Sequence, residues 1–173
     1  MNYAVSAIGR DRPGIVAAIS EVLFELGGNI DDSQMSILHG HFAVMLVVSV
    51  PAEVGRDALA ERLEAVRRRL DLEGLAVSEL DELAAGVAPT HVLTVYGADH
   101  PGIVHAVSTA LAEREVNITD LRTRRTGEEP PLYVMVMEIV VPGDEEELRR
   151  AMAEVGDRVA VEVSLRQLSS EAL

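Results

Sequence analysis

Cysteine, tryptophan and lysine are all absent from this 173-residue chain. Without cysteine the protein has no disulfide, thiolate nucleophile or thiolate metal ligand, which fits a reducing cytoplasm. Aromatic residues make up only 3% of the sequence, so the hydrophobic core must be aliphatic. A hydrophobic fraction of 48% beside 25% charged residues is typical of a globular protein rather than a disordered one.

Positive charge is also scarce. All 15 basic residues are arginine, against 29 aspartates and glutamates, and the formal net charge is −14. Because nucleic-acid affinity comes largely from basic side chains at phosphates, no direct binding to nucleic acid is expected. The N-terminus lacks a basic and then apolar targeting signal, and the longest apolar run, 42–48, is far short of the ~20 residues that span a bilayer. We therefore expect a cytoplasmic protein without a membrane segment.

One octapeptide organises the chain because it occurs twice. Residues 9–16 read GRDRPGIV, and residues 97–104, which begin 88 positions later, read GADHPGIV. The same offset relates the Asn-Ile pair at 29–30 to the Asn-Ile pair at 117–118. A glycine-bearing turn and a downstream asparagine at fixed spacing indicate two copies of one unit.

Hydrophobic periodicity predicts the same order of elements in both copies: strand, helix, strand, strand, helix, strand. The expected strands are 2–8, 29–38, 42–50 and 75–80, then 91–96, 117–125, 132–141 and 159–165, and the expected helices are 13–26, 53–70, 101–113 and one beginning at 144. Residues 39–41 and 126–131 are predicted as turns. Strands 42–50 and 132–141 are apolar on both faces, which predicts central strands that are covered twice.

This order predicts an α+β fold of two ferredoxin-like units, each with an antiparallel sheet and both helices on one face. The predicted boundaries are 1–82 for the first unit, 83–90 for a linker, 91–167 for the second unit and 168–173 for a tail. The uncovered side or edges of each sheet leave room for pairing between units or between chains.

The repeated turn predicts the start of a helix that suits an anion. Pro13 and Pro101 fit the first helical position, where a missing N–H costs nothing. Gly14 and Gly102 follow without a side chain and leave bare N–H groups at the positive end of the helix dipole. The alternative is a plain strand-to-helix connection in which the aspartate of the motif caps the helix.

The pattern Asp-x-Pro-Gly-Ile-Val after a strand, then a helix, then Asn-Ile opening the next strand, resembles the ACT domain. Both copies carry the pattern, so the resemblance covers nearly the whole chain, and a tandem pair without a catalytic domain is most similar to the glycine cleavage system transcriptional repressor family. The resemblance implies a non-enzymatic regulatory protein, without cofactor, that binds a small amino acid, glycine or similar, at ACT-domain interfaces. It also implies a homodimer and a protein partner such as a transcription factor.

The resemblance places the ligand against the loop before the first helix and the start of the second strand. The implied ligand-binding residues are Asp11, Arg12, Pro13, Gly14, Ile15, Asn29 and Ile30 in the first copy, and Asp99, His100, Pro101, Gly102, Ile103, Asn117 and Ile118 in the second. Such residues suit an α-amino acid, because the helix start can take its carboxylate, the aspartate its ammonium, and the asparagine offers a donor and an acceptor. The two copies differ, since Arg12 corresponds to His100 and the glycines at 27–28 correspond to Glu115 and Val116.

Two other functions stay open: an interaction scaffold that has lost ligand binding, and a separately encoded regulatory subunit of a metabolic enzyme. The sequence contains no nucleophile elbow, phosphate loop or metal-protease pattern, so no catalytic or metal site is predicted. His39 and His41 could face a metal together, but a hairpin turn is favoured, and His100 is expected to be a solvated loop residue. The arginines in 122–125 could meet an acidic partner, although pairing with the chain's own carboxylates is favoured.

Overall fold

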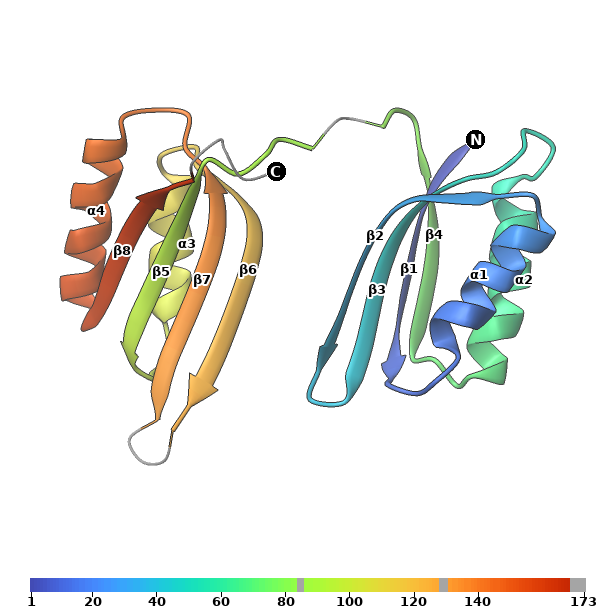
Figure 1. The fold of residues 1–173 in the computed structure, drawn as a ribbon, viewed down its shortest axis with the longest axis horizontal. Helices are drawn as coiled ribbons and strands as arrows, with labels where there is room; N and C mark the ends of the chain where they lie inside the picture. The colour runs from blue at the N-terminus through green and yellow to red at the C-terminus, as the bar shows by residue number, and fades with distance from the viewer. Residues whose placement is uncertain (84–85, 128–130, 169–173) are drawn as a thin grey trace. The chain divides into compact units, whose positions relative to one another are not determined.

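The computed structural model describes residues 1–83, 86–127 and 131–168. The chain divides into two compact units, Met1–Ala85 and Gly86–Leu173 (Figure 1). Residues 84–85 of the predicted linker, 128–130 of the predicted second turn and 169–173 of the predicted tail lie outside the described residues.

Both units have the predicted β-α-β-β-α-β order. The first contains β1 (Asn2–Arg10), α1 (Ile15–Glu25), β2 (Asn29–Leu38), β3 (His41–Ser49), α2 (Arg56–Arg69) and β4 (Gly74–Leu80); the second contains β5 (His91–Ala98), α3 (Ile103–Ala112), β6 (Asn117–Thr126), β7 (Leu132–Val140), α4 (Glu145–Arg158) and β8 (Val161–Gln167). The sheet orders are β2-β3-β1-β4 and β6-β7-β5-β8, and all strand pairs are antiparallel. The predicted ferredoxin-like α+β fold is therefore confirmed.

The duplication extends to strand register. β2 carries an irregularity against β3 between Ile30 and Asp32, and β6 carries one against β7 between Ile118 and Asp120. A bulge at the same place in both copies keeps the offset of 88 valid along the whole of both edge strands. Residues of the two units can therefore be compared position by position.

Each unit has its own core between the sheet and its two helices, which lie on one face (Figure 1). The expected aliphatic core is found in both, except that the first also buries Tyr3 and Phe42. Helix α1 buries Ile15, Ala18, Ile19, Val22 and Leu23, a spacing that puts these side chains on one stripe. In β3, the buried residues Phe42, Val44, Leu46 and Val48 alternate with residues that face away from the helices. Both helices and the middle strands thus meet as the hydrophobic pattern predicted.

The prediction that the middle strands are covered on both faces is wrong within each unit. The helices cover one face only, and Met45 on the other face of β3 remains 55% exposed. The corresponding residues of β7 are half-buried rather than buried. The doubly apolar pattern marks a central strand, but it does not require a second layer inside the same unit.

The ends of α1 and α3 show how the copies diverge. Gly27 adopts a φ of 69° after α1, as a left-handed C-cap requires. In the second unit Glu115 occupies this position with a φ of 56°, and the N–H of Val116 still donates to the carbonyl of Leu111 at 3.1 Å. The cap geometry is therefore kept without glycine, at the conformational cost of a left-handed non-glycine residue.

Candidate functional site

The Asp-x-Pro-Gly turns end in a helix start that no side chain caps. Helices α1 and α3 begin at Ile15 and Ile103, two residues after the prolines that were predicted to open them. Gly14 and Gly102 are the N-cap residues, with φ of 96° and 101°, and neither helix has a side-chain hydrogen bond at its cap. The predicted proline position is wrong because the left-handed glycine delays the helix, and the alternative of an aspartate cap is not observed either.

Backbone N–H groups at these helix starts have no partner within the helix. The first intrahelical bonds run from Ala18 N–H to the Gly14 carbonyl and from Ala106 N–H to the Gly102 carbonyl, both at 2.9 Å. The N–H groups that precede Ala18 and Ala106 point out of the helix at its positive end. A Cβ placed on Gly14 or Gly102 would meet no atom within 4 Å, so both turns face open space.

In the first unit the turn is exposed and its charged side chains are unengaged. The Asp11 N–H donates to the Gly40 carbonyl at 2.9 Å, which fixes the turn against the β2–β3 hairpin. His39 and Gly40 form this hairpin with φ of 50° and 78°, as a two-residue type I′ turn requires. Among the described residues, no hydrogen bond or ion pair involves the side chain of Asp11 or Arg12. This turn thus presents a carboxylate, a guanidinium and open N–H groups together.

In the second unit the side chains of the corresponding turn residues contact other residues of the same unit. Arg125 Nε lies 3.2 Å from Asp99 Oδ2, and the Asp99 side chain is only 29% exposed. His100 Nε2 lies 2.6 Å from the Val159 carbonyl oxygen, and its Nδ1 lies 3.1 Å from the Pro101 carbonyl oxygen. The expectation of a solvated loop histidine is wrong, because His100 ties the turn to the connection between α4 and β8.

The protonation of His100 follows from these two contacts. A neutral imidazole has one N–H and can donate to one carbonyl only, whereas an imidazolium can donate to both. The carbonyl of Pro101, and next that of Val159, therefore raise the pKa of His100, with a smaller contribution from the charge of Asp99 and an opposing one from burial. His100 thus favours the charged form more than a free histidine does.

The asparagines lie away from the turns. Asn29 and Asn2 both pair with Ser49, so Asn29 lies level with the start of β1, whereas the turn follows its end at Arg10. At ~3.3 Å per residue, roughly 25 Å separates the two levels. Asn29 Nδ2 donates to Asp31 Oδ1 at 2.8 Å, and Asp31 Oδ1 also accepts from Ser49 Oγ at 3.2 Å. Within one unit the structure does not bring the asparagine and the turn together, and Asn117 holds the same position in β6.

The isoleucines of the predicted site belong to the core. Ile15 and Ile103 are 2% exposed, so only their backbone N–H groups are available to a ligand. Ile30 and Ile118 pack against the two cores and are partly buried. The exposed parts of the predicted site are therefore residues 11–14, the second turn at 99–102 with a half-buried His100, and, at the far end of each sheet, Asn29 and Asn117.

Two residues near the second turn were not predicted as site residues. For the arginines in 122–125, pairing with the chain's own carboxylates was favoured over contact with an acidic partner. This is confirmed for Arg125, which contacts Asp99, and for Arg122, which pairs with Asp120 at 3.0 Å. Tyr133 lies beside Arg125 in register, and its pKa is raised, mainly by burial and further by the charge of Asp99. Sequence spacing gave no signal for the proximity of Arg125 to Asp99 and Tyr133, because β6 meets the end of β5 only through the order of the sheet.

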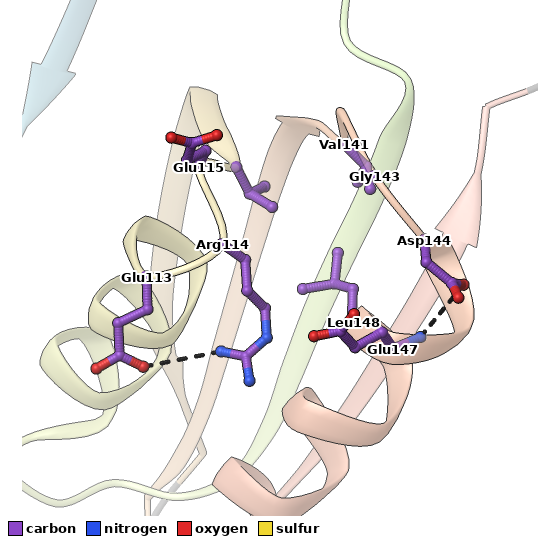
Figure 2. Close-up of a pocket in the computed structure, with 9 residues that line it drawn as sticks. Glu113, Arg114, Glu115, Val141, Gly143, Asp144, Glu147 and Leu148 are labelled. Carbon is purple, nitrogen blue, oxygen red and sulfur yellow. Dashed lines mark hydrogen bonds and ion pairs between the residues drawn. The ribbon is translucent and has the colours of Figure 1, made fainter.

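A separate hollow of about 330 Å³ lies between the end of α3 and the start of α4 (Figure 2). Its lining includes Arg114 together with the carboxylates Glu113, Glu115, Asp144 and Glu147, and none of the predicted site residues. Arg114 Nε is buried and has no hydrogen-bond partner in the part of the chain that the structure describes. With four carboxylates around one guanidinium, the hollow does not suit the carboxylate of an amino acid.

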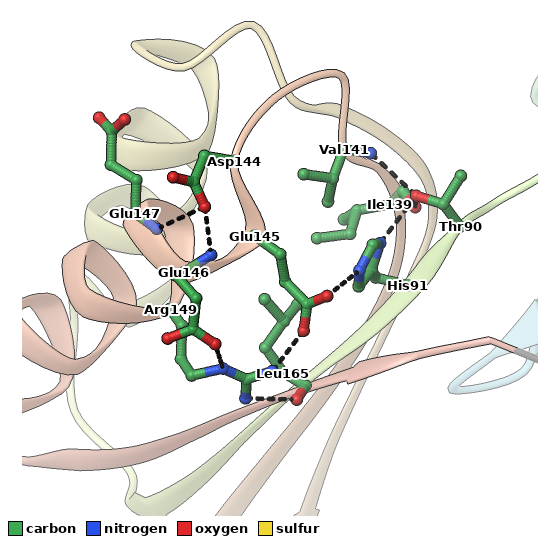
Figure 3. Close-up of polar contacts among 10 residues, drawn as sticks. All are labelled: Thr90, His91, Ile139, Val141, Asp144, Glu145, Glu146, Glu147, Arg149 and Leu165. Carbon is green, nitrogen blue, oxygen red and sulfur yellow. Dashed lines mark hydrogen bonds and ion pairs between the residues drawn. The ribbon is translucent and has the colours of Figure 1, made fainter.

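A buried histidine connects β5 to α4 (Figure 3). His91 is 5% exposed, its Nδ1 lies 2.8 Å from Thr90 Oγ1, and its Nε2 lies 3.3 Å from Glu145 Oε2. Glu145 also pairs with Arg149, whose Nη1 donates to the Leu165 carbonyl at 2.9 Å. The close contact with His91, and next that with Arg149, lower the pKa of Glu145 against the opposing effect of burial. This network anchors the helix rather than forming a reactive centre.

Metal and membrane sites are not found in the described ranges. Residues 1–83, 86–127 and 131–168 contain no group of three His, Asp or Glu side chains placed to hold a metal ion. Over the same ranges no helix is both long and apolar enough to cross a bilayer. His41 approaches Glu73 at 3.8 Å instead.

Known proteins share the sequence pattern and the fold of this chain. The ACT-domain pattern matches residues 4–76 and again residues 91–159. The chain belongs to the ACT-domain family. A UPF0237 protein of Methanopyrus kandleri is 38% identical over 76 residues, which cover 43% of this chain and 84% of that protein. Phosphoserine phosphatase SerB2 of Mycobacterium tuberculosis is 27% identical over 125 residues, which cover 70% of this chain and 30% of the phosphatase.

Two solved structures share the fold of this tandem ACT protein over nearly its full length. An unknown protein from Galdieria sulphuraria is 28% identical, with a TM-score of 0.81 and coverage of 97% of this chain and 98% of that chain. A protein provisionally assigned as a glycine cleavage system transcriptional repressor is 18% identical, with a TM-score of 0.71 and coverage of 98% of both chains. The tandem arrangement of two ACT units thus recurs in other proteins.

Proposed function

We propose that this protein is a non-enzymatic regulator that binds a small α-amino acid, glycine or similar, at its Asp-x-Pro-Gly turn and signals to a protein partner. The observation that carries the proposal is the turn of the first unit. There an uncapped helix start, an unengaged Asp11 and an unengaged Arg12 border the open space beside Gly14.

The chemistry of this turn is that of a zwitterion receptor. The ligand carboxylate accepts from the N–H groups at the start of α1 and from the guanidinium of Arg12. The ligand ammonium donates to the carboxylate of Asp11. Gly14 is required for its φ of 96° and leaves the ligand free to approach the backbone.

In the proposed site, the asparagine comes from a second chain. Asn29 lies at the opposite end of β2 from the turn, so it cannot contact a small ligand held by Asp11 of the same unit. An ACT unit of a second chain that pairs antiparallel with the edge strand β2 would bring its own Asn29 to the level of the turn. The ligand would then bridge two chains, and its binding would favour the paired state to the extent that it binds that state better.

We expect ligand binding to be signalled through contact with a protein partner and not through contact with nucleic acid. A net charge of −14 disfavours phosphate backbones, so control of transcription would act through a partner such as a transcription factor in the cytoplasm. The shared fold with the protein provisionally assigned as a repressor supports this output by analogy. Regulation of a metabolic enzyme by the chain as a separate subunit would use the same ligand site.

An interaction scaffold is the second candidate, and the second unit favours it. The occupied turn around Asp99 and His100 shows that an ACT unit can keep its fold with its turn filled by its own side chains. A scaffold would give no response to free amino acids. A thermal-shift screen of the full chain with the twenty amino acids separates the two, since a ligand that binds only the folded state raises the unfolding temperature.

The asparagine claim has its own test. Asn29→Ala should weaken the binding of the stabilising amino acid and shift the chain towards monomer in analytical ultracentrifugation with ligand. Glu79→Ala, an exposed position of β4 at the opposite edge of the same sheet, is the control and should leave both unchanged. Equal effects of the two variants would remove Asn29 from the proposed site.

A further inference from the structure

The two units differ at one strand position, and the residue there determines whether the aspartate of the turn has a cationic partner. Arg125, which pairs with Asp99, faces Tyr133 across the ladder of β6 and β7. With the offset of 88, its counterpart in β2 is Ile37, which faces Phe42 at the same place in the ladder of β2 and β3. The first unit therefore has an aliphatic side chain where the second has a guanidinium.

We propose that the first unit binds one α-amino acid with an aliphatic side chain per chain, its ammonium taking the place beside Asp11 that the Arg125 guanidinium takes beside Asp99, and that the second unit binds none. This inference rests on the proposed function and narrows its ligand. In the second unit the guanidinium of Arg125 occupies the position beside Asp99 that the ammonium group of the ligand would otherwise take.

The cation at Asp99 shows which group an aspartate at this turn accepts. A carboxylate attracts a cationic group, and Arg125 Nε lies 3.2 Å from Asp99 Oδ2 in an ion pair. The backbone around Asp11 is held in the same way, since both aspartates donate their N–H to a carbonyl of the neighbouring hairpin, that of Gly40 or Pro131. Within residues 1–83, 86–127 and 131–168, no cationic side chain pairs with Asp11.

The surroundings of Asp11 are apolar where those of Asp99 are polar. Ile37, at the position that Arg125 holds in the second unit, is 49% exposed. Val16, in the first turn of α1, adds apolar surface that the second unit shares through Val104. Phe42, which lies beside Ile37, has no hydroxyl, whereas Tyr133 has one. An aliphatic side chain attached to the bound amino acid would cover this apolar surface, which glycine would leave in water.

The two units also differ at the residue that follows the aspartate of the turn. His100 is committed to the carbonyl oxygens of Val159 and Pro101. Arg12, at the same position of the first unit, is exposed and makes no ion pair or hydrogen bond with described residues. Its guanidinium is therefore available to the ligand carboxylate, so both charges of the zwitterion have a complementary group in the first unit only.

The test is a reciprocal exchange between the two copies. Calorimetric titrations of the full chain use glycine, L-alanine, L-valine and L-leucine against the wild type, Ile37→Arg and Arg125→Ile. The wild type should bind valine or leucine at one site per chain, at least about tenfold more tightly than glycine. Ile37→Arg should abolish this binding by filling the site, and Arg125→Ile should open a second, weaker site, weaker because His100 stays committed.

Controls keep the exchange interpretable. Leu38→Arg adds the same charge one position along β2, on the opposite face of the strand, and should bind like the wild type. Arg125→Gln removes the charge and keeps a polar side chain, and it should also create a second binding site. This variant replaces Arg125→Ile in the test if Arg125→Ile does not fold. Circular dichroism checks that each variant has the content of helix and strand of the wild type.

Different outcomes overturn different claims. Unchanged binding by Ile37→Arg, a single site in both Arg125 variants, or two sites in the wild type would overturn the inference while amino-acid binding stands. Glycine binding as tightly as valine would overturn the side-chain preference. If the wild type bound no amino acid, that result would contradict the proposed function and therefore also this inference.

Discussion

Gly156 should be the least replaceable glycine of the second unit, although it lies inside a helix. A Cβ at this position of α4 would lie 2.6 Å from the Val161 carbonyl oxygen and 3.2 Å from Val163 Cγ2. Helix propensity alone would favour Gly156→Ala by ~1 kcal/mol. Overpacking costs ~1–3 kcal/mol, and a backbone carbonyl cannot rotate away as a side chain can, so the upper part of that range applies. We expect a net loss of about 1–2 kcal/mol, because the steric term exceeds the propensity term.

Unfolding of the full chain by urea, followed by circular dichroism, measures this loss, and the variant should lower the Tm of its unit by roughly 4–8 °C per kcal/mol. Gly143→Ala is the matched control, since a Cβ there meets nothing within 4 Å. This control should stay within about 0.5 kcal/mol of the wild type. A Gly156→Ala protein as stable as the wild type, or more stable, would refute the close approach of α4 to β8.

Three further changes test other local arguments. Glu115→Gly should stabilise the second unit by about 1 kcal/mol in urea unfolding, because glycine accepts the φ of 56° without strain; a loss of stability would contradict this. The lowered pKa of Glu145 means that its stabilising contribution is present above its ordinary value of 4.5 and is lost as the pH falls through the folded value. Glu145→Gln should therefore flatten the acid limb of the stability curve, and an unchanged limb would exclude this role. The raised pKa of His100 has the opposite sign: its contribution is full below 6.5 and is lost as the pH rises through the folded value. His100→Ala should remove that decline from a pH series of unfolding curves, and an unaltered series would show that its two carbonyl contacts do not matter.

Much of the fold follows from local pattern. The offset of 88 residues, the stripes of aliphatic residues and the hairpin at 39–41 predicted both units and nearly all of their strands. The starts of α1 and α3 were misplaced because the sequence does not show the conformation of a glycine: Gly14 could continue a helix or, as the structure has it, precede one with a φ of 96°. The N-terminal end of a helix is decided by one backbone angle, which periodicity does not report.

The site was less predictable than the fold, because its decisive contacts are not local. Arg125 reaches Asp99 across strand β7, and His100 reaches a carbonyl 59 positions away in the chain. No spacing rule relates such pairs before the sheet order is known. The distance between Asn29 and the turn has the same origin, since only the register of β1, β3 and β2 shows that they lie at opposite ends of the sheet.

The most direct test of the account is a titration in which Asp11 alone is changed. Calorimetry of the full chain with the amino acid that gives the largest thermal shift should show saturable binding at micromolar to millimolar concentration. Asp11→Asn should abolish that binding with the fold intact, and Asp57→Asn, an exposed aspartate in the first turn of α2, should leave it unchanged. Equal binding by the wild type and Asp11→Asn, or no heat with any amino acid, would contradict the claim that the first turn is the receptor.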